Sequence, residues 1–195
     1  HLKKEAPDLF KKARYITSQL QYVFEQLTGQ RFESKTIASG SGMFNIHTLE
    51  WDEDILKFAG ISPSMLCELK EATYFAPLKD SMAELLGIKS GIPVIIGGSD
   101  GALNQIGAGA LKRGIMTLSV GTSGAIRLAY NEPVLPQNRS TWCYYSLNKK
   151  RLAGAATSGA GNCLEWFKKK AYKGCGLTYE ELNQMAAKAN IQTAP

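Results

Sequence analysis

The sequence predicts a mixed α/β fold. Apolar residues recur every three or four positions over residues 7–27, which predicts an amphipathic helix. The apolar run 94–96 predicts a buried strand, and the small residues after it predict a helix over 102–110. Two more strands are expected over 116–120 and 125–130. Helices and strands thus alternate along the chain, as they do in α/β proteins.

The first half of the chain is expected to be mainly helical. Pro7 suits the first turn of the opening helix, and Gly29 suits its end. The region 30–50 is rich in Ser, Thr and Gly, and we expect a loop there that enters a short strand near Phe44. Further helices are expected over 51–60, from Ser62-Pro63, and over 78–86.

Glycine-rich corners separate the elements of the second half. Gly121-Thr122-Ser123-Gly124 has the composition of a hairpin turn between the two predicted strands. The corner at 155–161 is expected to lead into a helix over 162–172. Thr178 and Glu181 form a capping box, which predicts a last helix to about Asn190.

Composition excludes several classes of protein. The 195 residues are 44% apolar and 21% charged, which is typical of a globular protein. No apolar stretch approaches the roughly 20 residues that cross a bilayer, so no membrane partner is expected. The formal charge of +6 comes largely from short lysine clusters without a nucleic-acid-binding motif, so we expect charged helix faces and no nucleic-acid partner.

The cysteines and histidines indicate no metal site. Cys67, Cys143, Cys163 and Cys175 have no zinc-type spacing, and the sequence has only two histidines. Reduced thiols in a cytoplasmic protein are therefore expected. The three tryptophans are expected to be packing residues: Trp51, Trp142 and Trp166.

Asp100 is the candidate catalytic residue. It follows the predicted strand at 94–96 and precedes the predicted helix at 102–110. Open α/β sheets place ligands at such strand-to-helix corners. A carboxylate there could take the proton of a substrate hydroxyl as that hydroxyl attacks a phosphoryl group. A helix cap formed by Ser99 or Asp100 would explain the same residues.

Two glycine-rich corners are candidates for binding phosphate. The turn at 121–124 offers backbone N–H groups and two hydroxyls, and the corner at 158–161 would let backbone approach a nucleotide. A hairpin turn and tight helix–strand packing explain the two corners equally well. Together with Asp100, they indicate phosphoryl transfer.

Three segments, taken in order, resemble the FGGY family of carbohydrate kinases: GGSDGALNQIGAGAL, LSVGTSGAIR and SGAGNCLEWF. The upstream FNIHTLEWDEDIL and QYVFEQLTG are similar to segments that precede the catalytic aspartate in that family. GGSDGAL and GTSGAIR look most like the gluconokinase branch, and xylulose kinases are close relatives. The resemblance runs over nearly the whole chain.

The resemblance implies an actin-like, ribonuclease-H-like pair of α/β domains, incomplete in this chain, that closes on ATP and Mg²⁺. Residues 1–108 would be the C-terminal part of the N-terminal domain, and 109–195 the N-terminal part of the C-terminal domain. The full-length protein is expected to convert D-gluconate to 6-phosphogluconate. The 195-residue chain alone is expected to be inactive, because the first phosphate loop and the adenosine-binding motif are absent from it.

On the sugar side, the resemblance makes Asp100 the catalytic base. Gly101 stands where glycerol kinases have Gln, which argues against glycerol as the substrate. Arg127 lies shortly beyond the phosphate turn and is a candidate to bind the anionic group of a sugar acid, although a surface or inter-strand role would explain it as well.

On the nucleotide side, the resemblance assigns Gly121 and Thr122 to the loop that holds the transferring phosphate. Gly161 and Glu165 fall at family positions near the nucleotide. Glu165 stands where some members carry Gln, so its contact departs from the family pattern.

Three alternatives stay open from the sequence. Xylulose or another polyol could replace gluconate as substrate of the same family. A non-catalytic actin-like nucleotide-binding module is a reading from another class, and a basic nucleic-acid binder rests on charge alone. The oligomeric state is undecided, with a homodimer among the options.

Overall fold

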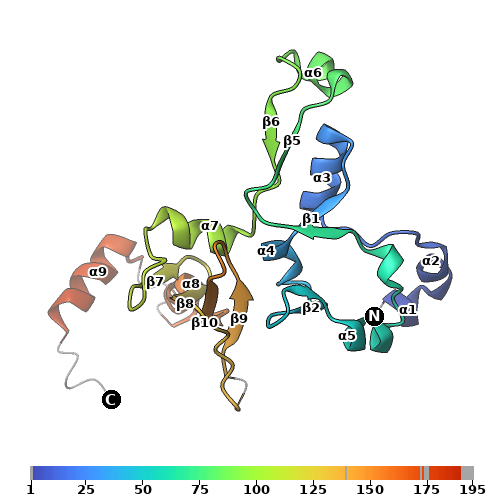
Figure 1. Cartoon of the computed structure of the whole chain (residues 1–195). Coiled ribbons are helices and arrows are strands. Elements are labelled where there is room, and N and C mark those ends of the chain that lie inside the picture. The colour runs from blue at the N-terminus through green and yellow to red at the C-terminus, as the bar shows by residue number, and fades with distance from the viewer. Residues whose placement is uncertain (1, 139, 172, 174–175, 190–195) are drawn as a thin grey trace. The chain divides into compact units, whose positions relative to one another are not determined.

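The computed structural model confirms a mixed α/β fold (Figure 1). It describes residues 2–138, 140–171, 173 and 176–189. The helices are α1 (Leu2–Glu5), α2 (Pro7–Lys12), α3 (Gln19–Thr28), α4 (Lys35–Ala38), α5 (Glu53–Ala59), α6 (Asp80–Leu86), α7 (Asp100–Gly107), α8 (Gly161–Lys170) and α9 (Tyr179–Lys188), with a 3₁₀ turn, η1 (Pro63–Met65). The strands are β1 (Phe32–Ser34), β2 (Phe44–Asn45), β3 (Glu50–Trp51), β4 (Glu68–Lys70), β5 (Phe75–Pro77), β6 (Pro93–Ile95), β7 (Met116–Val120), β8 (Gly124–Tyr130), β9 (Trp142–Tyr145) and β10 (Arg151–Thr157).

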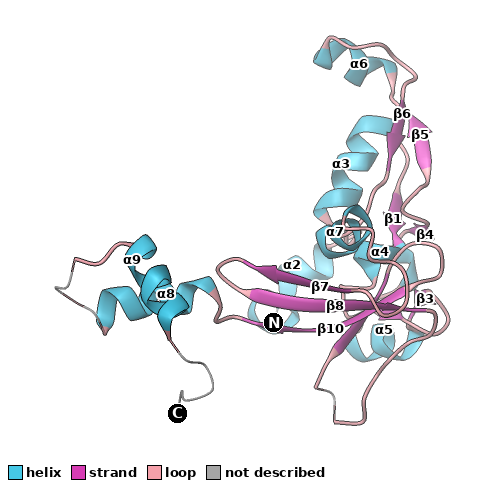
Figure 2. Cartoon of the chain, turned by 90° about the vertical axis from the view of Figure 1, so that its left-hand side faces the viewer, coloured by secondary structure: helices cyan, strands magenta, loops and turns pink. Residues whose placement is uncertain are grey.

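The chain divides into two compact units. The first unit consists of residues 1–117 and 127–155, and the second of residues 118–126 and 156–195. The unit boundaries fall within β7, β8 and β10, which belong to a four-stranded sheet of order β7-β8-β10-β9 (Figure 2). The chain therefore passes between the units along strands of this sheet.

One hydrophobic core of the first unit forms where α3 packs beside the antiparallel pair of β5 and β6 (Figure 1). Phe24, Ala76 and Ile96 are buried against one another there. Phe32 and Tyr74 pack on this cluster, with their ring centroids 5.2 Å apart in an edge-to-face arrangement. Such a pair adds to the stabilisation that apolar burial supplies.

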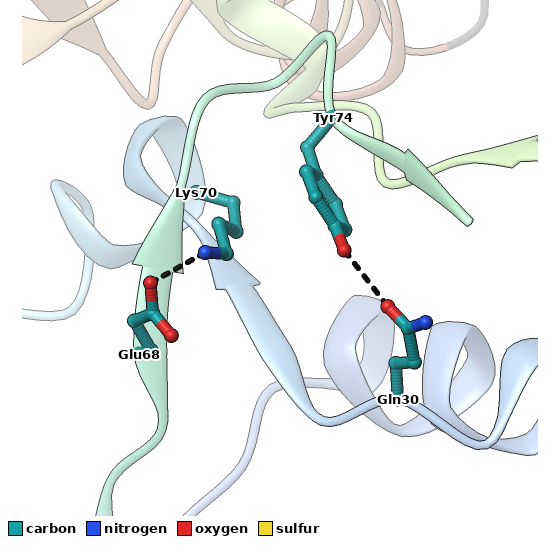
Figure 3. Close-up of polar contacts among 4 residues, drawn as sticks. All are labelled: Gln30, Glu68, Lys70 and Tyr74. Carbon is teal, nitrogen blue, oxygen red and sulfur yellow. Dashed lines mark hydrogen bonds and ion pairs between the residues drawn. The ribbon is translucent and has the colours of Figure 1, made fainter.

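Polar contacts connect the segments around this core (Figure 3). The Tyr74 hydroxyl donates a hydrogen bond of 2.8 Å to Gln30 Oε1, just after α3. In β4, which pairs parallel to β1, Lys70 forms an ion pair with Glu68. The Lys70 ammonium also lies 4.6 Å from the ring centroid of Phe32 in β1. Tyr74 thus ties the loop after α3 to the segment after β4, and Lys70 adds a side-chain contact between the paired strands β4 and β1.

The prediction of one helix over residues 7–27 is wrong, because the structure has two helices there, α2 and α3. α2 ends at Lys12, and residue Ala13 is extended, with φ −64° and ψ 120°. The Ile16 N–H donates to the Met65 carbonyl at 2.9 Å instead of to a helical partner. Ser18 then caps α3, its hydroxyl accepting the Gln21 N–H at 3.0 Å. A long-range backbone bond and a local cap together outweigh the helical periodicity.

Most other predicted elements are confirmed, several with the expected ends. The strand predicted over 94–96 is present as β6, but it is not buried as expected: Ile95 is 62% exposed, and only Ile96, just after the strand, is fully buried. Gly29, Gly60 and Gly87 close α3, α5 and α6 in the left-handed conformation. The capping box of Thr178 and Glu181 begins α9. The helix signal at Ser62 gives only the single 3₁₀ turn η1. The expected helix ends at Tyr172 and Asn190 lie outside the described residues.

Eight of the described elements were not predicted from the sequence: α1, β1, α4, β3, β4, β5, β9 and β10. β1 and α4 occupy part of the region expected to be a loop, and β9 and β10 follow the two predicted strands. β9 and β10 are an antiparallel pair joined by a tight turn, in which Asn148 and Lys149 have φ of 54° and 58°. Two consecutive residues with positive φ are typical of a hairpin turn that matches the twist of its strands.

Cys67, Cys143 and Cys163 are free thiols. Burial raises the pKa of the Cys67 thiol to about 11, so it stays protonated at neutral pH. Cys175 lies outside the described residues. Among the described helices, none has the length and apolar character needed to cross a membrane.

The core of the first unit gives a stability prediction. Ile96 is 1% exposed, whereas its neighbour Ile95 is 62% exposed. We expect Ile96→Ala to lower the free energy of unfolding by about 2–5 kcal/mol, because it opens a cavity in packed surroundings. The control Ile95→Ala should change it by less than about 0.5 kcal/mol. Urea denaturation measures both, and equal losses would contradict the assigned core.

Glu33 gives a pH prediction. This residue is buried, and burial raises the pKa of its carboxyl against the opposing hydrogen bonds from Ser18 and Ser34. The folded chain thus holds the proton more tightly than the unfolded chain. The resulting stabilisation is fully present below the ordinary pKa of 4.5 and is lost as the pH rises through the raised value.

We therefore expect Glu33→Gln to be more stable than the wild type at neutral pH and to lose this advantage near pH 4. The amide keeps an oxygen that can accept the Ser34 N–H and carries no charge to desolvate. Thermal unfolding across that pH range measures the difference. Glu84→Gln makes the same change at an exposed position of α6, and an identical pH dependence in the two variants would contradict the role given to burial.

Candidate functional site

Asp100 is the first residue of α7, directly after the loop that follows β6. Its side chain is exposed, and its Oδ1 accepts the N–H of Gly101 at 2.6 Å. Ser99 occupies the N-cap position, but its side chain makes no capping hydrogen bond. The structure thus places Asp100 at the helix start expected from the sequence, with its carboxylate open to solvent.

A buried hydroxyl holds the backbone immediately before Asp100. The Ser99 N–H donates to Thr36 Oγ1 at 3.0 Å, across 63 positions of the chain. Thr36 Oγ1 also lies 3.0 Å from Ser34 Oγ, and both hydroxyls are buried. A Cβ built on Gly98 would fall 2.6 Å from Thr36 Oγ1, so this close approach requires glycine. Thr36 was not identified from the sequence, because no local sequence pattern predicts a contact between residues 63 positions apart.

Asp100 lines a cavity of about 450 Å³ within the first unit. This volume is within the range of small-molecule sites. The hydroxyl-bearing residues Ser18, Thr36 and Ser41 contribute to its wall. The other lining residues that bear on function are Gly101, Arg127, Trp142 and Tyr144. Asp100, Gly101 and Arg127, three of the residues singled out from the sequence, are therefore brought together at one cavity.

Arg127 of β8 lies beside the start of α7. A Cβ built on Gly101 would be 3.2 Å from the Arg127 Nε, which is tighter than ordinary contact. The Arg127 guanidinium carbon is also 5.9 Å from the ring centroid of Trp142. A guanidinium in this position adds a fixed positive charge to the cavity wall.

The expectation that the tryptophans are packing residues is wrong for Trp166, which is 62% exposed. Trp142 does more than pack. It stacks on Tyr144, with centroids 4.7 Å apart and planes 23° from parallel, and both side chains line the cavity. Their alternate positions in β9 put them on one face of the strand. The signal that would have found them is the aromatic run at 142–145 ahead of the Asn148-Lys149 turn, a hairpin pattern.

Tyr145 anchors β9 from its other face. Its N–H donates to Ser39 Oγ at 2.7 Å, and its hydroxyl donates to Glu71 Oε2 at 2.8 Å. Glu71 in turn pairs with Lys35 of α4 at 3.2 Å. Burial raises the pKa of Tyr145 to about 12, with a further contribution from Glu71, so the phenol remains a neutral donor. The strand that carries the aromatic pair is thus fixed to the helix that carries Thr36.

The second unit holds the other residues singled out from the sequence, Gly121, Thr122, Gly161 and Glu165. The carbonyls of Gly121 and Thr122 accept N–H groups from the corner at 160–162, with Gly161 N–H to Gly121 O at 2.8 Å. A Cβ on Gly161 would lie 2.6 Å from that oxygen. The structure therefore brings the two glycine-rich corners into direct backbone contact.

Gly121 and Thr122 are exposed beyond this contact, although the Gly121 N–H itself donates to Ser123 O at 2.8 Å. Glu165 lies one turn into α8 and forms an ion pair of 2.6 Å with Lys169. Within the described part of the chain, no three His, Cys, Asp or Glu side chains gather closely enough to hold a metal ion. A metal bound here would need further ligands, such as the phosphates of a nucleotide.

The known proteins that this chain resembles in sequence and in structure include gluconate and xylulose kinases. The chain is 33% identical to a gluconokinase of Bacillus licheniformis over 165 residues, which is 84% of this chain and 32% of the relative. It is 32% identical to a xylulose kinase of Bacillus subtilis over 171 residues, 86% of this chain and 34% of the relative. The crystal structure of gluconate kinase from Lactobacillus acidophilus superposes with a TM-score of 0.91 at 29% identity, covering 97% of this chain and 38% of that one.

The chain spans about a third of the length of these curated relatives. Residues 1–107 match the model of the N-terminal domain of the FGGY family of carbohydrate kinases. That match covers more than half of the 195 residues and includes Asp100 and Thr36. The chain therefore belongs to the FGGY family of carbohydrate kinases.

Proposed function

We propose that the full-length gene product transfers the γ-phosphate of ATP to D-gluconate and forms 6-phosphogluconate. The observation that carries this proposal is the cavity that Asp100 shares with Arg127. A carboxylate and a guanidinium at one small-molecule site suit a substrate that has both a reacting hydroxyl and a carboxylate. Similarity to gluconokinases supports the choice of sugar acid.

Asp100 is the general base in this proposal. Its exposed carboxylate takes the proton of the accepting hydroxyl while the hydroxyl oxygen forms its bond to the γ-phosphorus and the bond from that phosphorus to ADP breaks. Gly101 next to it leaves room for the Arg127 side chain, since a larger residue would crowd the guanidinium. Arg127 binds the substrate carboxylate, and the Trp142–Tyr144 pair offers an apolar face to the carbon chain.

The nucleotide side of the proposal rests on the second unit. Gly121 and Thr122 hold the transferring phosphate, with the Thr122 hydroxyl and backbone N–H groups as donors. Gly161 lets the backbone of the second corner approach the first, and Glu165 lies near the nucleotide. Mg²⁺ would bind chiefly to the nucleotide phosphates and neutralise their charge.

We propose the domain division that goes with this assignment. Residues 1–108 form the C-terminal part of the N-terminal kinase domain, which carries the base and the sugar-side residues Asp100 and Gly101. Arg127, Trp142 and Tyr144, which line the same cavity, come from residues 109–195. Residues 109–195 form the N-terminal part of the C-terminal domain, which carries the phosphate loop. The family match over residues 1–107 supports this boundary.

A neutral sugar is the second candidate substrate. Similarity to a xylulose kinase favours it, at 32% identity against 33% for the gluconokinase. Arg127 distinguishes the two, because a neutral ketose has no anionic group to pair with a guanidinium.

The base assignment predicts the effect of Asp100→Asn. We expect it to lower sugar-dependent ATP consumption by about 10²–10⁴-fold, because the amide cannot take the proton. Asp80→Asn is the matched control, since Asp80 is also exposed and is the first residue of α6. ATP consumption by the full-length protein is measured over gluconate, xylulose, ribulose and glycerol. No turnover with any acceptor, or turnover indifferent to Asp100, would point to a non-catalytic nucleotide-binding module.

The Arg127 assignment predicts a change of specificity. We expect Arg127→Met to raise the KM for gluconate by about 10–100-fold, the value of a lost hydrogen-bonded charge pair, and to leave kcat/KM for a neutral ketose nearly unchanged. Arg113→Met removes the same charge at an exposed position and should change neither. An unchanged KM for gluconate in Arg127→Met would remove Arg127 from the substrate site.

A further inference from the structure

We propose that Thr36 is a positioning residue for the catalytic base, acting through the backbone at the start of α7. This inference rests on the proposed role of Asp100. Thr36 contributes to the cavity wall but is only 2% exposed, and its hydroxyl oxygen is engaged by protein partners, the Ser99 N–H and Ser34 Oγ. What it touches is the N–H of Ser99, the residue directly before Asp100.

The hydrogen bond from the Ser99 N–H to Thr36 Oγ1 takes the place of the side-chain cap that commonly holds the first turn of a helix. A serine at the N-cap commonly bonds its own side chain to a backbone N–H in the first turn. Ser99 makes no such bond, so its side chain does not fix the first turn of α7. The 3.0 Å bond from its N–H to Thr36 Oγ1 instead ties this corner to α4.

The Thr36 hydroxyl is itself held in place. Ser34 Oγ lies 3.0 Å away and is fully buried, and the Ser34 N–H donates to Glu33 Oε1 at 2.9 Å. Gly98 lies against the same oxygen, where a Cβ would fall at 2.6 Å. The loop before α7 thus packs closely on the Thr36 hydroxyl, and a methyl group on Gly98 would displace it.

The position of this loop matters to the proposed chemistry because a general base must lie about 2.6–3.2 Å from the atom whose proton it takes. A displacement of about 1 Å at the reacting groups can cost about 100-fold in rate. Thr36 thus sets the rate of the chemical step without touching the substrate.

The test compares Thr36→Val with Thr36→Ser in the full-length protein. Valine has the shape of threonine but cannot accept the Ser99 N–H, and we expect kcat to fall by about 10–100-fold while the KM for ATP stays unchanged. Serine keeps the oxygen and should restore kcat to near the wild-type value. Thr28→Val is the control for loss of a hydroxyl, since Thr28 Oγ1 accepts the Gln30 N–H at 3.1 Å away from α7. It should lower stability, because Thr28 Oγ1 also donates to the Phe24 carbonyl at 2.7 Å, and it should leave kcat unchanged.

The double variant Thr36→Val/Asp100→Asn separates positioning from general damage. If Thr36 acts only through Asp100, adding Thr36→Val to Asp100→Asn should lower the residual turnover no further. A further loss equal to that of Thr36→Val alone would overturn the proposal, as would an unchanged kcat in the folded single variant. If the wild type phosphorylates a sugar but not through Asp100, the proposed function fails first and the proposal fails with it.

Discussion

The hydrogen bond from the Ser99 N–H to Thr36 Oγ1 joins parts of the first unit that are far apart in the sequence. On one side of it are β1 and α4, and on the other is the loop from β6 into α7. Moving the loop away from the buried Thr36 would break this bond and take its acceptor from the Ser99 N–H, a cost that favours the observed position of the loop. The position of the Asp100 carboxylate and the shape of the neighbouring cavity both depend on that loop position.

In the second unit, too, a close backbone contact holds a loop against a helix start. Gly161 lies against the Gly121 carbonyl, and the first N–H groups of α8 find acceptors in the turn at 121–123. These bonds satisfy part of the polar backbone that any helix start leaves unpaired. β7, β8 and β10 each contribute residues to both units.

Local signals in the sequence predicted the helix starts and stops, the β7–β8 turn and the place of Asp100. Gly29, Gly60 and Gly87 end helices because glycine adopts positive φ readily, and this preference is visible in a single residue. The break between α2 and α3 and the bond between Ser99 and Thr36 depend on partners tens of residues away. The sequence predicts only packing for Trp142, because the cavity it lines is formed together with α7 and β8, which are distant in the sequence. Periodicity and motifs carry no information about such partners.

The central claim is that one cavity binds a sugar acid between the Asp100 carboxylate and the Arg127 guanidinium. A crystal structure of the full-length protein with gluconate and a non-hydrolysable ATP analogue tests it most directly. The account predicts the accepting hydroxyl within about 2.6–3.2 Å of an Asp100 oxygen and the gluconate carboxylate in a hydrogen-bonded pair with Arg127. Gluconate bound elsewhere, or with its carboxylate away from Arg127 and no hydroxyl near Asp100, would contradict the account.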